Sequence, residues 1–227
     1  MNNSTLESFF LAFNSSINGI ILNDLDGRFI YANSAFLKMA GYGDEKDILG
    51  KFPSEISHDK DHTRRVALEV REKGSWRGED VILRKDGALV NVEISISLIR
   101  DKKGNPSCSM ASLVDITERK RMERELQESE KKYRELIDAA PDAIFVADAE
   151  TGMILDTNRK AETLLSRTRG EILSMRQYEV HPKEDAERYM AVFKEHVQRG
   201  EGSTVDLFVA DKSGKKILEY PLNDEWV

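Results

Sequence analysis

Histidine and cysteine are the residues of this chain best suited to act as nucleophiles, proton carriers or metal ligands, and both are scarce. The 227 residues include four histidines and one cysteine, Cys108, so an internal disulfide is excluded. His, Asp and Glu do not gather at the spacings of a metal site. His181-Pro182 and His196-Val197 match neither the H-E nor the H-D box of a phosphoacceptor histidine, and no Gly-rich phosphate loop is present. We therefore expect no catalytic or metal site in this chain.

One long helix is predicted near the middle of the chain. From Asp115 to Ala140 most residues are charged, apart from a narrow stripe at alternating spacings of four and three, which is typical of a coiled-coil seam. We expect the helix to begin near Thr117, whose side chain would cap it, and to end before Pro141. The stripe consists of Met122, Leu126, Ser129, Tyr133, Leu136 and Ala140.

This stripe has two interpretations. It could form the seam of a parallel homodimer with the same helix of a second chain. It could instead pack against its own domain, because Tyr133 and Leu136 have counterparts in an N-terminal helix at Phe9 and Ala12, where no long helix precedes them. At about 1.5 Å per residue, the helix would be roughly 35 Å long and could relay a change between the segments on either side.

The residues before this helix predict a mixed α and β domain. Two strands joined by the turn Asp26-Gly27 come first, then a short helix capped by Asn33, a longer helix, and three strands. The longer elements are expected at residues 17–24, 28–32, 59–73, 81–83, 90–98 and 108–114. After the long helix the same order begins again, with Asn158 in the place of Asn33, about 125 residues later. This period indicates one domain used twice rather than a solenoid.

The composition indicates a soluble and highly charged protein. Charged residues make up 33% of the chain and hydrophobic residues 40%, and the formal net charge of -7 argues against nucleic-acid binding. No apolar run approaches the roughly 18 residues that a membrane span needs, and residues 1–13 resemble no signal peptide. We expect a cytoplasmic protein.

Six short motifs follow one another along the first copy, D-x-D-G, Y-A-N, I-L-G-K, W-R-G-E, R-K-D-G and D-I-T-E-R-K. They lie at residues 24–27, 31–33, 48–51, 76–79, 84–87 and 115–120. In this order they resemble the PAS sensory domains of signalling proteins, such as the sensing region of histidine kinases, and the second copy matches as far as Gly214. The resemblance implies an α+β fold with a five-stranded antiparallel sheet in each domain and helices on one face. It places the first domain at 1–116, a helical linker at 117–140 and the second domain at 141–227.

The second copy is shorter than the first at its C-terminal end. Only 13 residues follow Gly214, whereas the first copy has about 29 residues from Gly87 to Ile116 for its final two strands. We expect the second copy to lack the last strand, which in the family lies in the middle of the sheet. Ile144–Asp148 would then either pair directly with Leu218–Leu222 or keep an exposed edge. Pro221 also removes a donor from that ladder.

The resemblance further implies a cavity between the sheet and the helices. Its lining would include Phe36, Met39, Trp76, Ile94 and Met110, although packing of an ordinary core would explain the same residues. Asp115 and Thr117 would anchor the first domain to the linker helix.

Cofactors known in the family find little support in these residues. Some PAS sensors bind haem through a histidine on the long helix, and His58 and His62 lie in or near that region, but the match is not residue for residue, so haem is not expected. Flavin photochemistry needs a cysteine in an N-C-R-F-L-Q helix, whereas Cys108 is predicted on a strand, so it is not expected either. The cofactor, if any, stays unknown.

We interpret the chain as a sensory module of signal transduction that binds a small ligand or a partner protein and relays its state through the linker helix. Its downstream partner would be a kinase or a response protein of a two-component system. One alternative is the sensing fragment of a histidine kinase or a cyclic-dinucleotide enzyme whose catalytic part lies elsewhere. The other is a dimerisation adaptor without a ligand.

Overall fold

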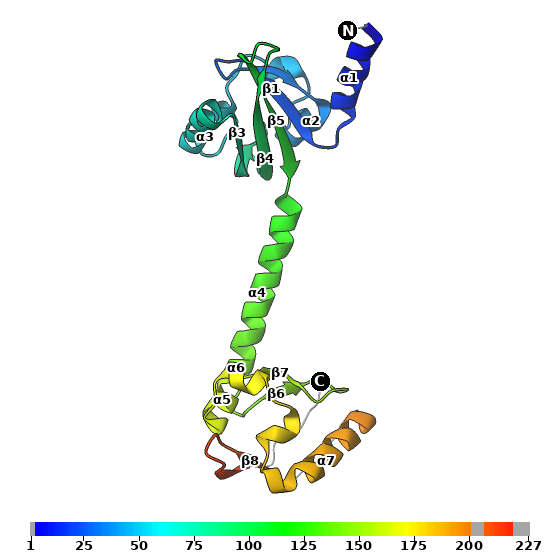
Figure 1. Ribbon diagram of the computed structural model, residues 1–227, viewed down its shortest axis with the longest axis vertical. Helices are drawn as coiled ribbons and strands as arrows, with labels where there is room; N and C mark the ends of the chain where they lie inside the picture. Colours follow the sequence, from blue (N-terminus) through cyan, green and yellow to red (C-terminus); the bar gives the residue numbers. More distant parts are fainter. Residues whose placement is uncertain (1–2, 201–206, 220–227) are drawn as a thin grey trace. The chain divides into compact units, whose positions relative to one another are not determined.

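The computed structural model describes residues 3–200 and 207–219. The chain forms two compact units, residues 1–125 and 126–227, which divide within the long helix α4 (Thr117–Ala139) (Figure 1). Within the described residues, every helix is too short or too polar to span a bilayer.

The first unit is built on one five-stranded antiparallel sheet in the order β2-β1-β5-β4-β3. Its strands are β1 (Gly19–Asn23), β2 (Phe29–Ala32), β3 (Ser75–Leu83), β4 (Leu89–Arg100) and β5 (Pro106–Asp115). Its helices are α1 (Asn3–Ser15), α2 (Ser34–Ala40) and α3 (Lys60–Lys73), with short 3-10 turns η1 (Glu45–Asp47) and η2 (Pro53–Glu55). The five-stranded sheet expected from the sequence is confirmed, with the last strand in its middle.

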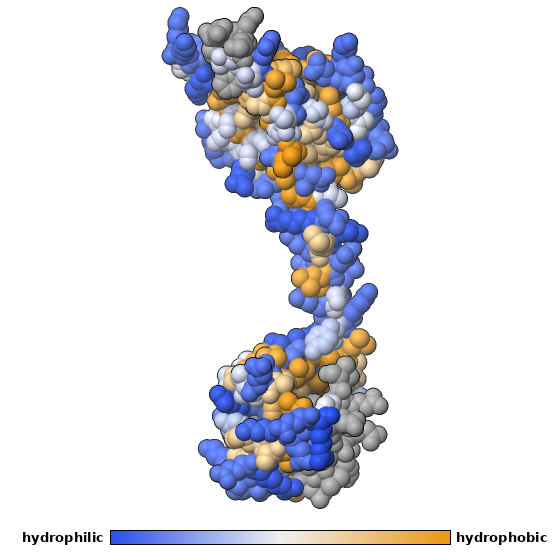
Figure 2. Space-filling view, turned by 90° about the vertical axis from the view of Figure 1, so that its right-hand side faces the viewer, coloured by the Kyte–Doolittle hydropathy of each residue, from blue (hydrophilic) through white to orange (hydrophobic). Residues whose placement is uncertain are grey.

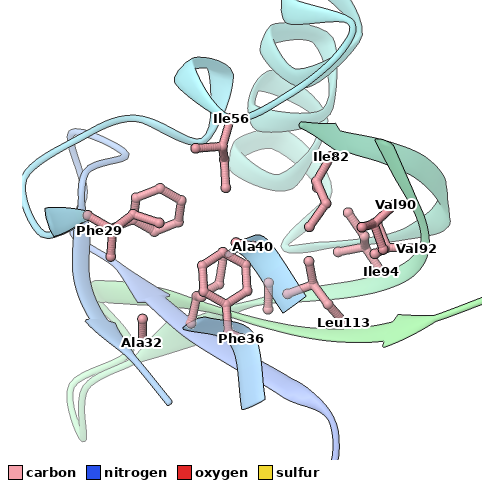
Figure 3. Packing of buried hydrophobic residues seen from close by; sticks show 13 residues of the cluster. Phe29, Ala32, Phe36, Ala40, Ile56, Ile82, Val90, Val92, Ile94 and Leu113 are labelled. Atoms are coloured by element: carbon pink, nitrogen blue, oxygen red, sulfur yellow. The ribbon is translucent and has the colours of Figure 1, made fainter. Parts of the chain in front are cut away.

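The alternation of residues along the strands decides which face of this sheet is buried. Val90, Val92 and Ile94 of β4 are buried, while the residues between them are more exposed. Leu113 of β5 pairs with Ile94 and lies on the same inner face. Figure 3 shows these side chains meeting Phe29, Phe36 and Ile56 in the space between the sheet and the helical segments. The core of the first unit therefore lies on one face of the sheet.

Helix α2 begins at a buried asparagine, as predicted. Oδ1 of Asn33 accepts hydrogen bonds from the backbone N–H groups of Phe36 and Ile20, each at 2.9 Å. Its Nδ2 donates to the carbonyls of Phe13 and Asn18. All four hydrogen bonds of this amide are made, so Asn33 ties the end of α1 to β1 and to the start of α2.

Helix α4 has the predicted bounds, but its first turn is held differently from the prediction. Thr117 is already helical, and its N–H donates to Oδ1 of Asp115 at 2.8 Å. The Thr117 hydroxyl does not cap the helix. It accepts a hydrogen bond of 3.0 Å from the N–H of Asn91 on β4, and the N–H of Ile116 donates to the Asn91 carbonyl at 2.9 Å. The hydroxyl is used by the neighbouring strand β4, and the Asp115 carboxylate accepts the hydrogen bond from the Thr117 N–H at the start of the helix.

The second unit contains two small antiparallel sheets. Its elements are β6 (Phe145–Ala147), β7 (Ile154–Thr157), α5 (Arg159–Leu165), α6 (Arg169–Leu173), η3 (Gln177–Val180), η4 (Lys183–Asp185), α7 (Ala186–Arg199), β8 (Leu207–Ala210) and β9 (Lys216–Glu219). Among the described residues β6 pairs only with β7, and β9 pairs only with β8. The direct pairing considered for Ile144–Asp148 and Leu218–Leu222 is therefore not formed in that part of the chain, and Tyr220 to Leu222 lie outside the described residues.

Candidate functional site: a cavity in the first unit

A cavity of about 500 Å³ lies between the inner face of the sheet and the segments that cover it. Strands β1, β3, β4 and β5 form one wall, and α2, η2 and α3 contribute the other. Most of its lining side chains are apolar. This volume falls within the roughly 300–1,000 Å³ typical of sites for small molecules.

Aromatic residues border the cavity, and two of them, Phe29 and Phe36, are 1% and 0% exposed and belong to the buried core behind its surface. The rings of Phe29 and Phe36 lie 5.9 Å apart between their centroids. Trp76 lines the wall from β3, with its indole ring edge-on to the imidazole of His62 at 5.7 Å. Gly78 leaves room for this indole, because a Cβ at that position would lie 2.6 Å from Cζ2 of Trp76. The tryptophan and the glycine of the W-R-G-E motif therefore act together to shape the wall.

Polar groups concentrate where the β1–β2 hairpin borders the cavity. Asn23 is 6% exposed, and its Nδ2 donates to the carbonyl of Gly27 at 3.3 Å. Ser109 lies directly across from it on β5 and also belongs to the lining. Arg71 of α3 donates a hydrogen bond of 2.8 Å to the carbonyl of Leu25, which joins the end of the helix to the hairpin. These contacts build a polar rim on an otherwise apolar cavity.

The structure brings together three of the five residues predicted to line a ligand site. Phe36, Trp76 and Ile94 belong to the cavity lining. Met39 packs against the buried core instead. Met110 lies on the opposite face of β5 from Ala111, which is a lining residue. A role of these five residues in ligand binding stays a prediction.

Sequence reasoning missed the polar residues of the rim. A signal existed for Asn23, because it follows Ile21 by two positions on β1 and so lies on the buried face of a strand. Ser109 and Arg71 gave no such signal. Ser109 reaches the rim through the pairing of β5 with β1, and Arg71 reaches it through a contact between α3 and the hairpin. In both cases the two partners are far apart in the sequence.

The two histidines considered for haem lie outside the cavity lining. His62 packs on Trp76, and its Nε2 is buried without a hydrogen-bond partner among the described residues. The backbone N–H of His58 donates to the carbonyl of Val81. In the described ranges, no group of three or more His, Cys, Asp or Glu side chains is placed to hold a metal ion.

The apolar stripe of α4 is exposed to solvent. The exposed fractions of Met122, Leu126, Tyr133 and Leu136 are 54%, 61%, 45% and 74%. Figure 2 shows apolar side chains on the otherwise hydrophilic surface of this helix. The packing of the stripe on its own domain is therefore not seen in the described residues.

The C-terminal half of α4 is bonded to the second unit. Asp156 of β7 accepts hydrogen bonds from Arg134 of α4 and Arg169 of α6, both at 3.0 Å. Burial of this carboxylate would raise its pKa, but the hydrogen bonds from Arg134, from the Thr157 N–H and from Arg169 together hold the pKa of Asp156 below its ordinary value. Asn158 adds a bond from its Nδ2 to the carbonyl of Ile137 at 2.9 Å. The linker is thus held by a strand of each unit, near its two ends.

Two family models match the chain. Residues 17–118 match the model described as a PAS domain, and residues 131–219 match the model described as a PAS fold. The first match covers the unit that holds the cavity.

The chain is also similar to curated proteins and to a solved structure. Sporulation kinase E of Bacillus subtilis is 29% identical over 152 residues, covering 66% of this chain and 20% of the kinase. Sporulation kinase A of the same organism is 33% identical over 126 residues, covering 53% of this chain and 20% of the kinase. A crystal structure of the PAS domain of a protein from Colwellia psychrerythraea is 26% identical, with a TM-score of 0.47, and covers 50% of this chain and 98% of that one. The chain spans about a fifth of the length of either kinase.

Proposed function

Because this chain consists of two PAS domains in tandem, we propose that it is the sensing region of a longer cytoplasmic sensor kinase, in which the first domain binds a small molecule. The first domain would extend over residues 1–116, the linker over 117–140 and the second domain over 141–227. Catalysis would belong to a part of the protein outside these residues, which resemble sensory domains.

The cavity of the first domain is the observation that carries this proposal. Its volume of about 500 Å³ and apolar lining suit a small organic molecule, and Ile94 of β4 contributes to its wall. Asn91, three residues earlier on the same strand, bonds to Ile116 and Thr117 at the start of α4. A ligand that shifts β4 would therefore move groups that hold the linker helix.

A substitution at the edge of the cavity tests ligand binding. Ala67 of α3 lines the cavity, whereas Leu68 beside it is 59% exposed and is not a lining residue. Ala67→Phe should fill part of the cavity and weaken the binding of biphenyl, used as an uncharged apolar probe, by at least about tenfold in titration calorimetry. Leu68→Phe is the matched control and should keep the affinity within about twofold of the original chain.

Native mass spectrometry of the freshly purified chain complements this titration, because it reports any molecule that copurifies together with the oligomeric state. If biphenyl does not bind the original chain and no added mass is found, the proposal of a ligand-binding first domain is wrong.

A second candidate function is dimerisation through α4. The exposed stripe of Met122, Leu126, Tyr133 and Leu136 favours it, because a seam of this spacing is completed by a second helix. We infer a parallel homodimer in which the two linker helices pair and the partner of the dimer is a kinase or a response protein. This function is compatible with ligand binding in the first domain.

A further inference from the structure

Asn23 is a polar residue in the wall of an apolar cavity. Its side chain is buried, and its Nδ2 donates to the Gly27 carbonyl. This bond settles the orientation of the amide, because the opposite orientation would place two carbonyl oxygens against each other. No described residue donates a hydrogen bond to Oδ1 of Asn23, although Asn23 lies in the cavity lining. Oδ1 is also absent from the buried polar atoms that lack a partner, so this oxygen is accessible and can accept a hydrogen bond from a molecule in the cavity.

Ser109 places a second polar group beside this acceptor. The two residues are directly opposite each other in the β1–β5 ladder, and both belong to the lining. Side chains of such a pair lie on the same face of the sheet at a distance of about 5 Å between their Cβ atoms. A group of the ligand that hydrogen-bonds Asn23 would also be within reach of the Ser109 hydroxyl, which can donate or accept.

The charged residues of the lining favour a neutral ligand. Both arginines are engaged, Arg64 with Asp61 at 2.9 Å and Arg71 with the Leu25 carbonyl at 2.8 Å. The acidic residues of the lining are Asp24, Asp26 and Asp80. An anion would meet more acidic than basic groups and would displace existing bonds of the arginines. The apolar and aromatic residues that form the rest of the wall would also disfavour the burial of a charge.

We propose that the ligand of this cavity is a neutral, mainly aromatic molecule with one hydrogen-bond donor, such as a hydroxyl group, which binds Oδ1 of Asn23. The inference rests on the proposed function of the first domain as a ligand sensor. The aromatic body of the ligand packs against Trp76 and the apolar side chains that line the cavity beside it, where apolar contact provides most of the affinity. The donor completes the hydrogen bonding of Asn23 and selects this ligand over apolar molecules of the same shape.

Three substituted biphenyls test the proposal with the full chain. Biphenyl-4-ol has a donor, 4-methoxybiphenyl has the same body without a donor, and biphenyl-4-carboxylate is an anion. We expect titration calorimetry to show biphenyl-4-ol binding roughly tenfold more tightly than 4-methoxybiphenyl. The carboxylate should bind more weakly than either.

Two substitutions assign this preference to the polar rim. Asn23→Leu should reduce the tenfold preference to about onefold while 4-methoxybiphenyl still binds, which also shows that the variant is folded. Ser109→Ala removes only a hydroxyl and should reduce the preference in part. Its matched control is Ser112→Ala on the same strand, which is outside the cavity lining and should leave the preference unchanged.

The outcomes separate this inference from the proposed function. Equal binding of biphenyl-4-ol and 4-methoxybiphenyl to the original chain would overturn the inference but leave ligand binding intact. The same is true if the carboxylate binds most tightly, or if Ser109→Ala and Asn23→Leu both keep the full preference. Failure of every probe, biphenyl included, together with the absence of any copurified mass would instead overturn the proposed function.

Discussion

Each domain contains one buried asparagine at an equivalent position, and the two residues make the same set of contacts within their own domains. Asn33 and Asn158 are both fully buried, and each caps the helix that follows it. In each case Nδ2 donates to the last part of the preceding helix, at Phe13 or Ile137. Oδ1 accepts from the N–H of Ile20 in β1 or of Ile144, directly before β6. The role of Asn33 as a helix cap, expected from the sequence, is confirmed. Each amide also connects a flanking helix to its domain, so a substitution there would loosen the helix as well as remove the cap.

His181 is a mostly buried histidine that packs against Tyr189 and strand β8 in the second domain. The ring of His181 stacks on Tyr189 with centroids 3.7 Å apart, and its Nδ1 lies 2.8 Å from the Phe208 carbonyl. The Tyr189 hydroxyl accepts from the Phe208 N–H at 3.1 Å, so the two side chains hold both backbone groups of one residue of β8. Burial lowers the pKa of His181, although the hydrogen bond to Phe208 and the charge of Asp185 raise it.

The lowered pKa predicts a loss of stability in mild acid. Above the unfolded value of about 6.5 both states are neutral at His181. As the pH falls below 6.5, the unfolded chain binds a proton that the folded domain resists, so the free energy of unfolding falls by up to about 1.4 kcal/mol per pH unit. His181→Phe keeps the stacked ring but cannot titrate. Urea unfolding followed by amide signals of the second domain should show a smaller pH dependence in this variant, and identical slopes would contradict the prediction.

At the scale of the element, α4 combines fixed ends with an unpaired face. Its start is bonded to Asn91 of β4, and its end is bonded to Asp156 of β7 and to Asn158, the residue that caps α5. Between these bonds the helix exposes the stripe to solvent. Four of its exposed side chains are large and apolar, and these would gain from burial against a second helix. This arrangement suits a helix that both dimerises and transmits a change.

A change of one residue of the stripe tests the homodimer. Leu126→Lys places a charge in the centre of the predicted seam in both chains and should raise the dimer dissociation constant by at least roughly a hundredfold, because two buried leucines are lost. Gln127→Lys adds the same charge one position away, outside the stripe, and should leave the dimer intact. Light scattering measures both. If the Leu126→Lys chain dimerises as tightly as the original chain, the coiled-coil model of the linker is wrong.

At the scale of the whole molecule, the two halves differ in how their strands are paired. Strand β4 is hydrogen-bonded on both sides, to β3 and β5. In the described part of the second half each strand has one partner. Strands with partners on one side open at a lower free-energy cost than central strands of a large sheet. The second half should therefore be the less stable one in this chain.

Amide hydrogen exchange measures this difference. The amides of Val90–Leu98 should exchange at least about tenfold more slowly than those of residues 144–200 and 207–219. Val92 and Ile154 form a matched pair for the comparison, because their exposed fractions are 0% and 2% and their side chains are thus equally buried. Equal protection at these two positions and along the strands would mean that the second half is as stable as the first.

The sequence alone determined the features of this protein that depend on short-range patterns. The repeated order of motifs identified the family and the two copies. The alternation along Val90–Leu98 predicted a strand with one buried face, the spacing after Asp115 predicted a helix, and Pro141 predicted its end, because each follows from the geometry of a single element. Asn33 was predicted as a cap for the same reason, since its partners include an amide only three residues away.

The tertiary structure decided which side chains meet. Met110 was predicted for the cavity, but the register of β5 against β1 directs Ala111 to the inner face. The same register brings Ser109 opposite Asn23, although the two are 86 positions apart in the sequence. The Thr117 hydroxyl bonds to Asn91 rather than to its own helix, because β4 lies next to it. Pairing between distant strands leaves no local pattern in the sequence, so the meeting of Asn23 with Ser109 at the cavity becomes visible only when the sheet is assembled.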